Sequence, residues 1–387
     1  MQMELSNKKK VLILSEWYLP GRNAGGPVKS IESFVCSMKE YLQFYILTTD
    51  TDLGETKPYD SVKTNEWLEQ HDGVSICYLK SGGITTSKLI EAIKCTGCDY
   101  IYINSLYSKW FSIVPIRLNL QGKISCKIVL APRGMLSDGA LKLKTFKKKT
   151  FILFSRLIGF HRNITWHASN FQEADEIKHH FGPESRVEVI RNFSIPLTKV
   201  KSDLIKERGI LKLFFLSRVS RVKNLHIAIK SLKLLKNLQA KVLFDVYGSQ
   251  EDPIYLNECK ELIAVLGNGI EVNFMGPVLN SDIARVISDY HFLFLPTSNE
   301  NFGHSIFESL QCGVPVIISN KTPWKKLSEY GCGWEKEPVP ENYIPILEKC
   351  IKMDEKEYAK MSDGAALYAK EYFQDNQMIV KTLSLFS

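Results

Sequence analysis

Two glutamates in the second half of the chain have the spacing that most clearly predicts chemistry. Glu300 and Glu308 are separated by seven residues within the segment 291–320, HFLFLPTSNENFGHSIFESLQCGVPVIISN. The segment predicts a buried strand at Phe292–Leu295, a polar loop, and a short helix that opens near Gly303. Backbone N–H groups at such a crossing point at an anion, and the glycine lets it come close. Glu308, one turn into the helix, is placed to accept hydrogen bonds from vicinal hydroxyls, so the segment is expected to hold a sugar nucleotide.

Two cations are candidate partners for that anion. Arg218 and Lys223 lie in LKLFFLSRVSRVKNLHIAI, just past one predicted strand and just before a predicted helix. Arginine offers a planar fork and lysine a movable point charge, so together they can offset a diphosphate leaving group without a metal. Surface loops often carry such pairs. The Arg218 and Lys223 pair becomes stronger evidence for a diphosphate site because Glu300 and Glu308 lie at the carboxyl edge of the same predicted sheet.

The elements that must position these residues alternate between apolar strands and helices. In the first half we predict strands at Val11–Ser15, Phe44–Thr48, Ser75–Leu79, Tyr100–Ile103, Lys127–Leu130, Ile164–Trp166 and Val187–Ile190. A second series comprises Leu211–Ser217, Lys241–Tyr247, Ile270–Phe274, Phe292–Leu295 and Val314–Ser319. This alternation predicts an α/β fold with parallel sheets covered by helices, which bind ligands at the carboxyl ends of the strands.

Length and linker composition predict two domains. The 387 residues exceed one ordinary core, and a charged, proline-containing connection interrupts the alternation at about 193–208. We expect an N-terminal Rossmann-like domain over 1–196 and a C-terminal one over 207–369. A helix at about 370–387 is expected to return to the first domain. Two such domains in tandem are expected to face each other across a ligand cleft.

The composition excludes several protein classes. Hydrophobic residues make up 44% and charged residues 24% of the chain, which is typical of a folded soluble protein. No apolar run reaches the ~18 residues of a membrane span. The lysines of MQMELSNKKK precede a strand, not a signal-peptide apolar region, so we expect a cytoplasmic protein. The single CxxC, Cys95 to Cys98, has no second ligand pair, and Gly97 within it is typical of a helix C-cap.

The net charge of +8 indicates an anionic partner. Its densest cluster is LKLKTFKKKTFILFSRL, which has five lysines between Lys142 and Lys149 followed by an apolar stretch. No recognisable nucleic-acid module surrounds it, so we do not expect nucleic acid to bind. A basic and apolar segment suits attachment to an anionic membrane surface, here the inner face of the cell membrane. A solvated helix face remains the alternative.

Several segments together resemble a known family. SRVSRVKN, VYGSQED, FMGPVLNSDI and LPTSNENFGHSIFESLQCGVPVIIS resemble the nucleotide-sugar domain of family 4 glycosyltransferases, which are retaining enzymes of the GT-B fold. In the N-terminal half, the glycine loop after the first strand and the segments HASNFQEAD and VIRNF fit as well. The resemblance covers nearly the whole chain and is strongest from 211 to 334. It implies two facing Rossmann-like domains with the ligand cleft between them.

The resemblance implies a role for each candidate residue. Arg218 and Lys223 would bind the diphosphate. Glu308 would hold the ribose hydroxyls and Glu300 the hydroxyls of the donor sugar, so that Arg218, Lys223 and Glu300 form the catalytic set. The other implied donor contacts are Gly25, Gly26, Val278, Phe302, Gly303 and His304. A helix-terminal carboxylate favoured by the macrodipole at Glu308, and a solvated loop acid at Glu300, are the structural alternatives.

The implied reaction replaces a nucleoside diphosphate at an anomeric carbon by an acceptor hydroxyl. It needs no cofactor beyond the UDP- or GDP-linked substrate, and the implied acceptor is a glycan or a polyprenyl-linked glycan in surface polysaccharide assembly. In the family the usual account is front-face substitution, in which the departing phosphate accepts the acceptor's proton. No metal is predicted, because the lone Asp50-Thr51-Asp52 is explained by turn aspartates after a strand.

The chain departs from the family pattern in the first domain. Where many relatives carry a histidine near the donor sugar, the stretch VLAPRGML places Arg133. Arg133 is a candidate contact for an anionic donor sugar or for a phosphate on the acceptor, and a structural loop arginine is the alternative. His167 in TWHASN is interpreted as a helix-entry residue, with Ser169 or Asn170 as the cap. A nucleotide-sugar epimerase on the same fold and a non-catalytic glycan-binding protein are the competing functions.

Overall fold

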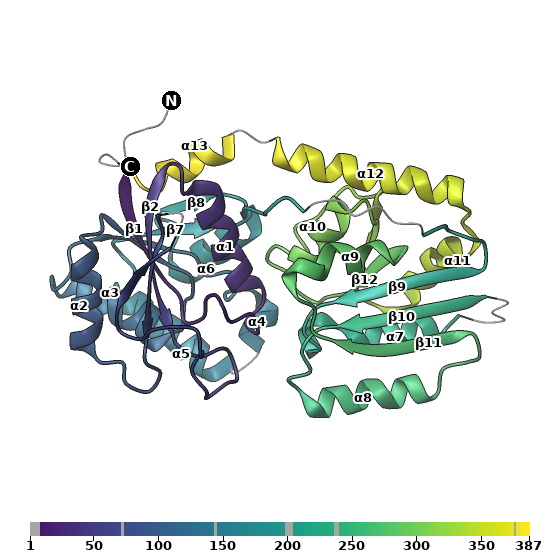
Figure 1. Cartoon of the computed structure of the whole chain (residues 1–387), viewed down its shortest axis with the longest axis horizontal. Helices are drawn as coiled ribbons and strands as arrows, with labels where there is room; N and C mark the ends of the chain where they lie inside the picture. Colours follow the sequence, from purple (N-terminus) through teal and green to yellow (C-terminus); the bar gives the residue numbers. More distant parts are fainter. Residues whose placement is uncertain (1–7, 71–72, 143–144, 198–203, 236–239, 375–376) are drawn as a thin grey trace. The chain divides into compact units, whose positions relative to one another are not determined.

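The computed structural model describes residues 8–387 except 71–72, 143–144, 198–203, 236–239 and 375–376. The chain divides into two compact units (Figure 1). The first comprises residues 1–195 together with 376–387, and the second comprises 196–375. Each unit is an α/β structure built on one largely parallel sheet, so each is described by itself.

The described strands of the first unit form one sheet in the order β3-β4-β2-β1-β5-β6-β7-β8. Only the short β3 runs antiparallel, against β4. The strands are β1 (Lys9–Leu14), β2 (Leu42–Thr49), β3 (Trp67–Glu69), β4 (Ser75–Leu79), β5 (Tyr100–Ile103), β6 (Lys127–Leu130), β7 (Ile164–Ala168) and β8 (Val187–Val189). Central strands such as β5 are buried along their whole length, which explains their unbroken apolar sequences.

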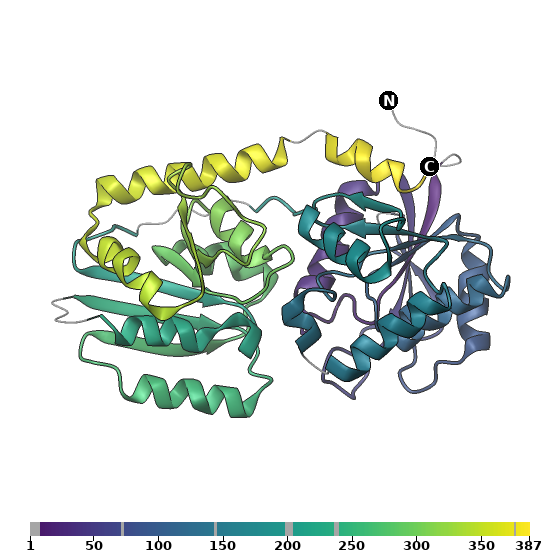
Figure 2. The same ribbon diagram turned by 180° about the vertical axis from the view of Figure 1, so that it is seen from behind.

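Helices cover both faces of this sheet. One core cluster joins the sheet to α1 and to Leu385 and Phe386 at the end of the chain, and the other joins it to α2, α3, α5 and α6. Figure 2, viewed from behind, brings α5 to the front of the sheet. The described helices of this unit are α1 (Gly26–Met38), α2 (Thr86–Thr96), the π-helix η2 (Lys109–Ile113), α3 (Val114–Leu120), α4 (Asp138–Lys142), α5 (Thr145–Leu157), α6 (Phe171–Phe181) and α13 (Gln377–Ser384).

The described strands of the second unit are all parallel, in the order β11-β10-β9-β12-β13-β14. They are β9 (Ile210–Leu216), β10 (Lys241–Tyr247), β11 (Ile270–Gly276), β12 (Phe292–Leu295), β13 (Val316–Ser319) and β14 (Gly333–Lys336). The edge strand β14 was not predicted, because its sequence GWEK has no apolar run. The pairing of β14 with β13 requires glycine at position 333, because a Cβ there would lie 2.1 Å from the carbonyl oxygen of Val316.

A single core cluster holds the second unit together. Its described helices are α7 (Leu225–Lys233), α8 (Pro253–Ala264), α9 (Ile283–Ser288), α10 (His304–Gln311), α11 (Ile344–Lys352) and α12 (Glu355–Phe373), with short 3₁₀ turns η3 (Arg221–Lys223), η4 (Asn280–Asp282) and η5 (Pro340–Tyr343). The long α12 begins with a capping box, in which Asp354 and Glu357 satisfy each other's backbone N–H groups.

The predicted fold class is confirmed, since the chain folds as two parallel-sheet α/β units. The strands Tyr100–Ile103, Lys127–Leu130 and Lys241–Tyr247 have the predicted bounds, and Gly97 is a left-handed helix C-cap as expected. Among the described helices, none combines the length and the apolar character needed to cross a bilayer. That the two domains enclose a ligand cleft stays a prediction.

Candidate active site

Two loops meet at the carboxyl edge of the second sheet. Because β9 and β12 are neighbours, the loop that follows each strand emerges at the same edge. The carbonyl oxygen of Val222 accepts hydrogen bonds from the backbone N–H of Ser298 at 2.8 Å and from the hydroxyl of Thr297 at 3.0 Å. The Asn224 amide donates to the carbonyl of Pro296 at 2.9 Å. These bonds fix the Arg218–Lys223 segment against the loop that carries Glu300.

Lys223 and Glu300 form an ion pair at this junction. Only 16% of the lysine side chain and 14% of the glutamate side chain are exposed. Lys223 ends the turn η3, where its backbone N–H donates to the carbonyl of Ser220, and Glu300 is held by its N–H bond to the carbonyl of Lys321 at 3.1 Å. Two residues predicted to act on one ligand are therefore in contact, and their charges are satisfied together in a largely dry position.

The loop continues from Glu300 into helix α10. Gly303 caps the helix with φ 81°, and a Cβ there would lie 2.8 Å from Cδ1 of Ile306 and 3.0 Å from Cγ of Glu300. The backbone conformation and the close approach both require glycine. The Trp324 indole N–H donates to the carbonyl of Phe302, and this bond helps to fix the loop. The helix N-terminus is thus held rigidly beside the Glu300 side chain.

Glu308 and His304 lie on α10 itself. Glu308 is buried in the second turn, and the ring of His304, the first residue of the helix, lies 4.8 Å from that of Phe302. Burial is uncommon for a glutamate unless its carboxylate is hydrogen-bonded. Glu300, with 14% of its side chain exposed, is not a solvated loop acid.

Arg218 lies in the loop after β9 and has a different environment. Its guanidinium forms an exposed ion pair with Glu251 at 3.4 Å. The loop is held by Val219, whose N–H donates to the carbonyl of Ser249 at 2.9 Å. Gly248 makes this approach possible, because at φ 142° a Cβ would lie 2.0 Å from the Ser217 carbonyl oxygen. Among the described residues Arg218 forms no hydrogen bond or ion pair with Lys223 or Glu300.

Val278 lies in the turn after β11, one strand beyond β10 on the same sheet. Gly276 enters the turn with φ 80°, and the Val278 side chain packs partly against the core. The turn presents main chain at the carboxyl edge of the sheet, as the prediction of a base contact requires. Its role stays a prediction.

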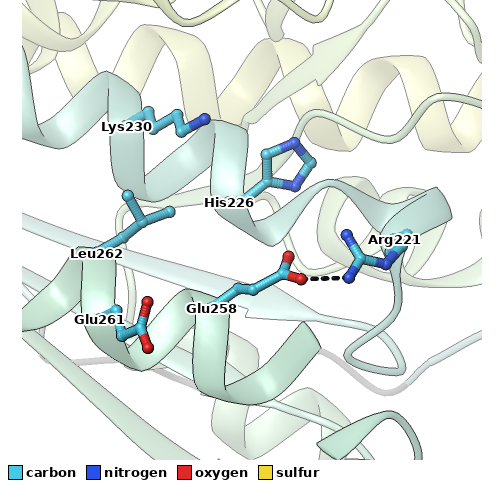
Figure 3. A pocket seen from close by; sticks show the side chains of 6 residues that line it. All are labelled: Arg221, His226, Lys230, Glu258, Glu261 and Leu262. Atoms are coloured by element: carbon cyan, nitrogen blue, oxygen red, sulfur yellow. Dashed lines mark hydrogen bonds and ion pairs between the residues drawn. The ribbon is translucent and has the colours of Figure 1, made fainter. Parts of the chain in front are cut away.

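A pocket of about 310 Å³ lies beside η3, between α7 and α8 (Figure 3). Its lining comprises Arg221, His226, Lys230, Glu258, Glu261 and Leu262. Arg221 forms an ion pair with Glu258 across it, as the dashed line in Figure 3 marks. None of the residues predicted to bind the donor lines this pocket.

In the first unit, the glycine-rich loop after β1 ends at Gly25, which caps α1 with φ 66°, and Gly26 begins the helix. Sequence reasoning missed how the loop is anchored. The Asp52 carboxylate accepts hydrogen bonds from the backbone N–H of Arg22 at 2.7 Å and of Asn23 at 3.0 Å. Asp52 is the last residue of the sequence Asp50-Thr51-Asp52. Its carboxylate is engaged in these two hydrogen bonds to the backbone of the glycine loop.

Arg133 follows β6 with a φ of 54°, which is uncommon for a residue with a side chain. Its Nε donates to the amide oxygen of Asn104 at 2.8 Å, and its Nη2 to the hydroxyl of Tyr102 at 2.7 Å. Its Nη1 donates to the amide oxygen of Asn192. All three partners are neutral. In the described part of the chain the Arg133 guanidinium has no carboxylate partner.

The network continues to His167, which lies inside β7. The expectation of a helix-entry residue was therefore wrong for His167. Asn170, three residues later, caps α6 by accepting from the Glu173 N–H at 2.8 Å.

The His167 ring contacts Tyr102 through Nδ1 at 2.7 Å and the Ile190 carbonyl through Nε2 at 2.9 Å. Burial, with a smaller contribution from Arg133, lowers the pKa of His167 to about 3, so the ring is neutral. A carbonyl can only accept, so Nε2 donates to Ile190 and Nδ1 accepts from the tyrosine.

A buried carboxylate fixes the residue after Arg133. Glu173 accepts hydrogen bonds from the Gly134 N–H at 2.5 Å and from both the N–H and the hydroxyl of Ser169 at 2.7 Å.

The sequence did contain a signal for the two asparagines that bind Arg133. Asn104 directly follows β5 and Asn192 follows β8, so each places a polar side chain at the carboxyl edge of an apolar strand.

Known proteins resemble parts of this chain. Residues 199–365 match the model of the family described as Glycosyl transferases group 1. A D-inositol 3-phosphate glycosyltransferase from Pseudarthrobacter chlorophenolicus is 24% identical, and the match spans 42% of this chain and 42% of that relative, less than half of either.

Two solved structures align with nearly the whole chain. HepE from Anabaena in complex with UDP-glucose is 18% identical with a TM-score of 0.72, and covers 97% of this chain and 99% of its own. WaaG, a glycosyltransferase involved in lipopolysaccharide biosynthesis, is 14% identical with a TM-score of 0.60, and covers 97% and 98%. These alignments agree with the GT-B fold that the motifs implied.

Proposed function

We propose, because residues 199–365 match the glycosyl transferases group 1 model, that the chain transfers a sugar from a nucleotide donor to a glycan or lipid-linked acceptor with retention of anomeric configuration. The observation that carries the proposal is the largely buried ion pair between Lys223 and Glu300, beside the glycine-capped N-terminus of α10. A cation, a carboxylate and a helix N-terminus at one sheet edge suit a diphosphate attached to a polyol.

In the proposed reaction, the acceptor oxygen forms a bond to the anomeric carbon while the bond from that carbon to the phosphate oxygen breaks. The acceptor's proton passes to the departing phosphate. The protein's contribution is electrostatic, because charge grows on the leaving oxygen where Lys223 and the α10 N–H groups stabilise it. Arg218 joins them by leaving its exposed partner Glu251, at small cost for a surface ion pair.

Donor binding divides the Lys223–Glu300 pair in this proposal. Lys223 turns to the diphosphate, and Glu300 accepts hydrogen bonds from hydroxyls of the donor sugar. Glu308, buried one turn further along α10, holds the ribose hydroxyls. The exchange replaces one charge-assisted contact by several, so neither charge is left unpaired in the complex.

The substrate classes are part of the same proposal. HepE was solved with UDP-glucose and WaaG acts in lipopolysaccharide biosynthesis, which supports a UDP- or GDP-linked sugar and a cell-surface glycan for this chain. We propose that Arg133 contacts an anionic group on the donor sugar or the acceptor. We propose turnover without a metal, in cytoplasm or at the inner membrane face.

The test is release of nucleoside diphosphate by the purified chain from a panel of UDP- and GDP-sugars, with and without glycan acceptors. We expect one donor to be cleaved faster than the others and an acceptor to accelerate the release. Conversion of the donor to its epimer without release would instead identify an epimerase. Donor binding without any turnover would identify a glycan-binding protein and overturn the proposed reaction.

A further inference from the structure

Helix α5 exposes an apolar stripe to solvent. Its large apolar side chains, with their exposed fractions, are Phe146 (83%), Leu153 (60%), Phe154 (64%) and Leu157 (74%), and Ile158 just beyond the helix is 60% exposed. At about 100° per residue, the four helical positions fall within one sector about 100° wide. Such a stripe normally faces a protein core, and here it faces solvent.

The opposite side of the same helix accounts for its attachment to the sheet. Ile152 belongs to the core of the first unit, and the ring of Phe151 lies 5.6 Å from that of Tyr107. Lys148 also points inward, where its ammonium donates to the carbonyl of Ala140 at 2.7 Å and lies over the Tyr107 ring. The helix therefore has two apolar faces. Only one of them is needed to hold it in place.

Cations border the exposed stripe. Lys147 lies on one side of it, and Lys149 and Arg156 lie on the other, all of them exposed. Residues 139–172 contain no Asp or Glu, and their basic residues are Lys142, Lys144, Lys147, Lys148, Lys149, Arg156 and Arg162. Within the lysine cluster 142–149, Lys144 and the side chain of Lys142 lie outside the described residues. Along this stretch of the chain the formal charges are thus all positive, and they flank an apolar stripe.

We propose that this α5 face, defined by Phe146, Leu153, Phe154, Leu157 and Ile158 with Lys147, Lys149 and Arg156, docks the protein on an anionic lipid surface. The apolar side chains enter the boundary between headgroups and acyl chains, and the cations pair with lipid phosphates. The helix axis lies in the plane of the surface. This inference is independent of the proposed reaction.

The charge pattern favours lipid over the other candidate occupants. Two copies of the face meeting around a two-fold axis would bring cations against cations, which opposes self-association. Nucleic acid would pair with the lysines but would leave the phenylalanine and leucine side chains against a polar backbone. A bilayer with anionic headgroups offers both an apolar interior and phosphates at the required depth.

The experiment is flotation of the full chain with phosphatidylcholine vesicles that either contain or lack phosphatidylglycerol. We expect retention on the anionic vesicles only, weakened by salt. Two double variants, Phe154→Ser with Leu157→Ser and Lys147→Glu with Lys149→Glu, are each expected to lower the partition coefficient by about tenfold or more. Matched control changes on α8 of the second unit, at the exposed Ile254→Ser and Lys260→Glu, are expected to leave it unchanged.

Circular dichroism and thermal unfolding verify that each variant is folded. The proposal is overturned if the wild-type chain stays in the soluble fraction, if neutral vesicles retain it equally, or if both double variants bind as the wild type does. Light scattering supplies a further outcome. A dimer that Phe154→Ser converts to a monomer, with no vesicle binding, would identify the face as a contact between copies of this chain.

Discussion

In each unit a cation of interest lies in the loop after a strand of the sheet, Lys223 in the second unit and Arg133 in the first, and these two cations are held in opposite ways. Lys223 in the second unit is paired with the carboxylate of Glu300. Arg133 in the first unit is bound by the neutral oxygens of Asn104, Tyr102 and Asn192. One positive charge is compensated before any ligand arrives, and the other has no carboxylate partner among the described residues.

The difference indicates two kinds of binding. A lysine is a movable point charge on a flexible stem, so Lys223 can exchange Glu300 for a phosphate. Arg133 is fixed by three hydrogen bonds and a positive φ, so it offers a fixed positive charge and can move little. We infer that the second unit adjusts when the donor binds, while the first unit presents a preformed site.

The largest effect is expected from Lys223→Ala. Loss of the ammonium removes charge stabilisation from the leaving group, so kcat should fall by about two to three orders of magnitude. Initial rates of nucleoside diphosphate release measure this effect. Lys230→Ala, an exposed lysine on α7 outside the proposed site, is the matched control and should retain the wild-type rate. A near-normal rate in Lys223→Ala with an intact fold would contradict the role of Lys223.

The second prediction concerns acid sensitivity, in which the first unit should exceed the second. Burial lowers the pKa of His161 to about 4 and of His167 to about 3 in the first unit, and of His291 to about 4 in the second. Above pH ~6.5 these rings are neutral in both the folded and unfolded states. As the pH falls below that value, the unfolded chain takes up protons that the folded chain resists, so stability is lost.

His161→Phe isolates one of these contributions. Neither ring nitrogen of His161 has a hydrogen-bond partner in the described part of the chain, and aromatic rings surround it. The variant should lose about 2 kcal/mol less stability than the wild type between pH 7 and pH 5. Denaturant unfolding at both pH values measures this, and hydrogen exchange assigns it to the first unit. The exposed His179→Gln is the control; equal pH dependence in all three proteins would refute the prediction.

A third change, Arg133→Lys, tests whether the fixed cation binds a substrate. Lysine keeps the charge but cannot bridge three acceptors in one plane, so kcat/KM should fall by about tenfold. The loss should appear as a raised KM for the substrate that carries the anionic group, with kcat nearly unchanged. Arg117→Lys, an exposed change on α3, is the control. Wild-type KM values for both substrates would leave Arg133 a structural loop residue.

The smallest effect is expected from Glu251→Gln, which removes the exposed partner of Arg218. An exposed ion pair contributes about 0–1 kcal/mol, so thermal unfolding should change little. Turnover should stay at or slightly above the wild-type rate, because Arg218 becomes available to the diphosphate without an exchange. A tenfold loss of turnover would show that the Arg218–Glu251 pair itself orders the site.

Much of the fold could be predicted because the strands are buried on both faces and therefore have unbroken apolar sequences. The strand at 100–103 was located to the residue. Two kinds of element were harder to predict. Strand β14 has a mixed sequence, and it can pair with β13 because Gly333 has no side chain to clash with the Val316 carbonyl. His167 was placed at a helix entry because β7 runs two residues beyond its apolar core.

The candidate site divides along similar lines. Glu300, Glu308, Gly303, Arg218 and Lys223 were identified by their positions after predicted strands, since the carboxyl edge of a parallel sheet collects such loops. The anchors of the first unit were missed. Asp52 is far in sequence from the glycine loop that it fixes, and Tyr102 and Asn192 contact Arg133 from different strands. Contacts between residues so far apart in the sequence cannot be predicted from the spacing of residues within a short motif.

The sequence by itself determined most of the strand and helix pattern, the family resemblance of the second unit and the chemical types at the sheet edge, because these follow from local periodicity and short motifs. Only the tertiary structure decided which charges meet. It paired Lys223 with Glu300, surrounded Arg133 with neutral oxygens, and left one apolar face of α5 without a core to cover it. Those outcomes depend on strand order and on which side of a helix is buried, and both are set by packing between residues distant in the chain.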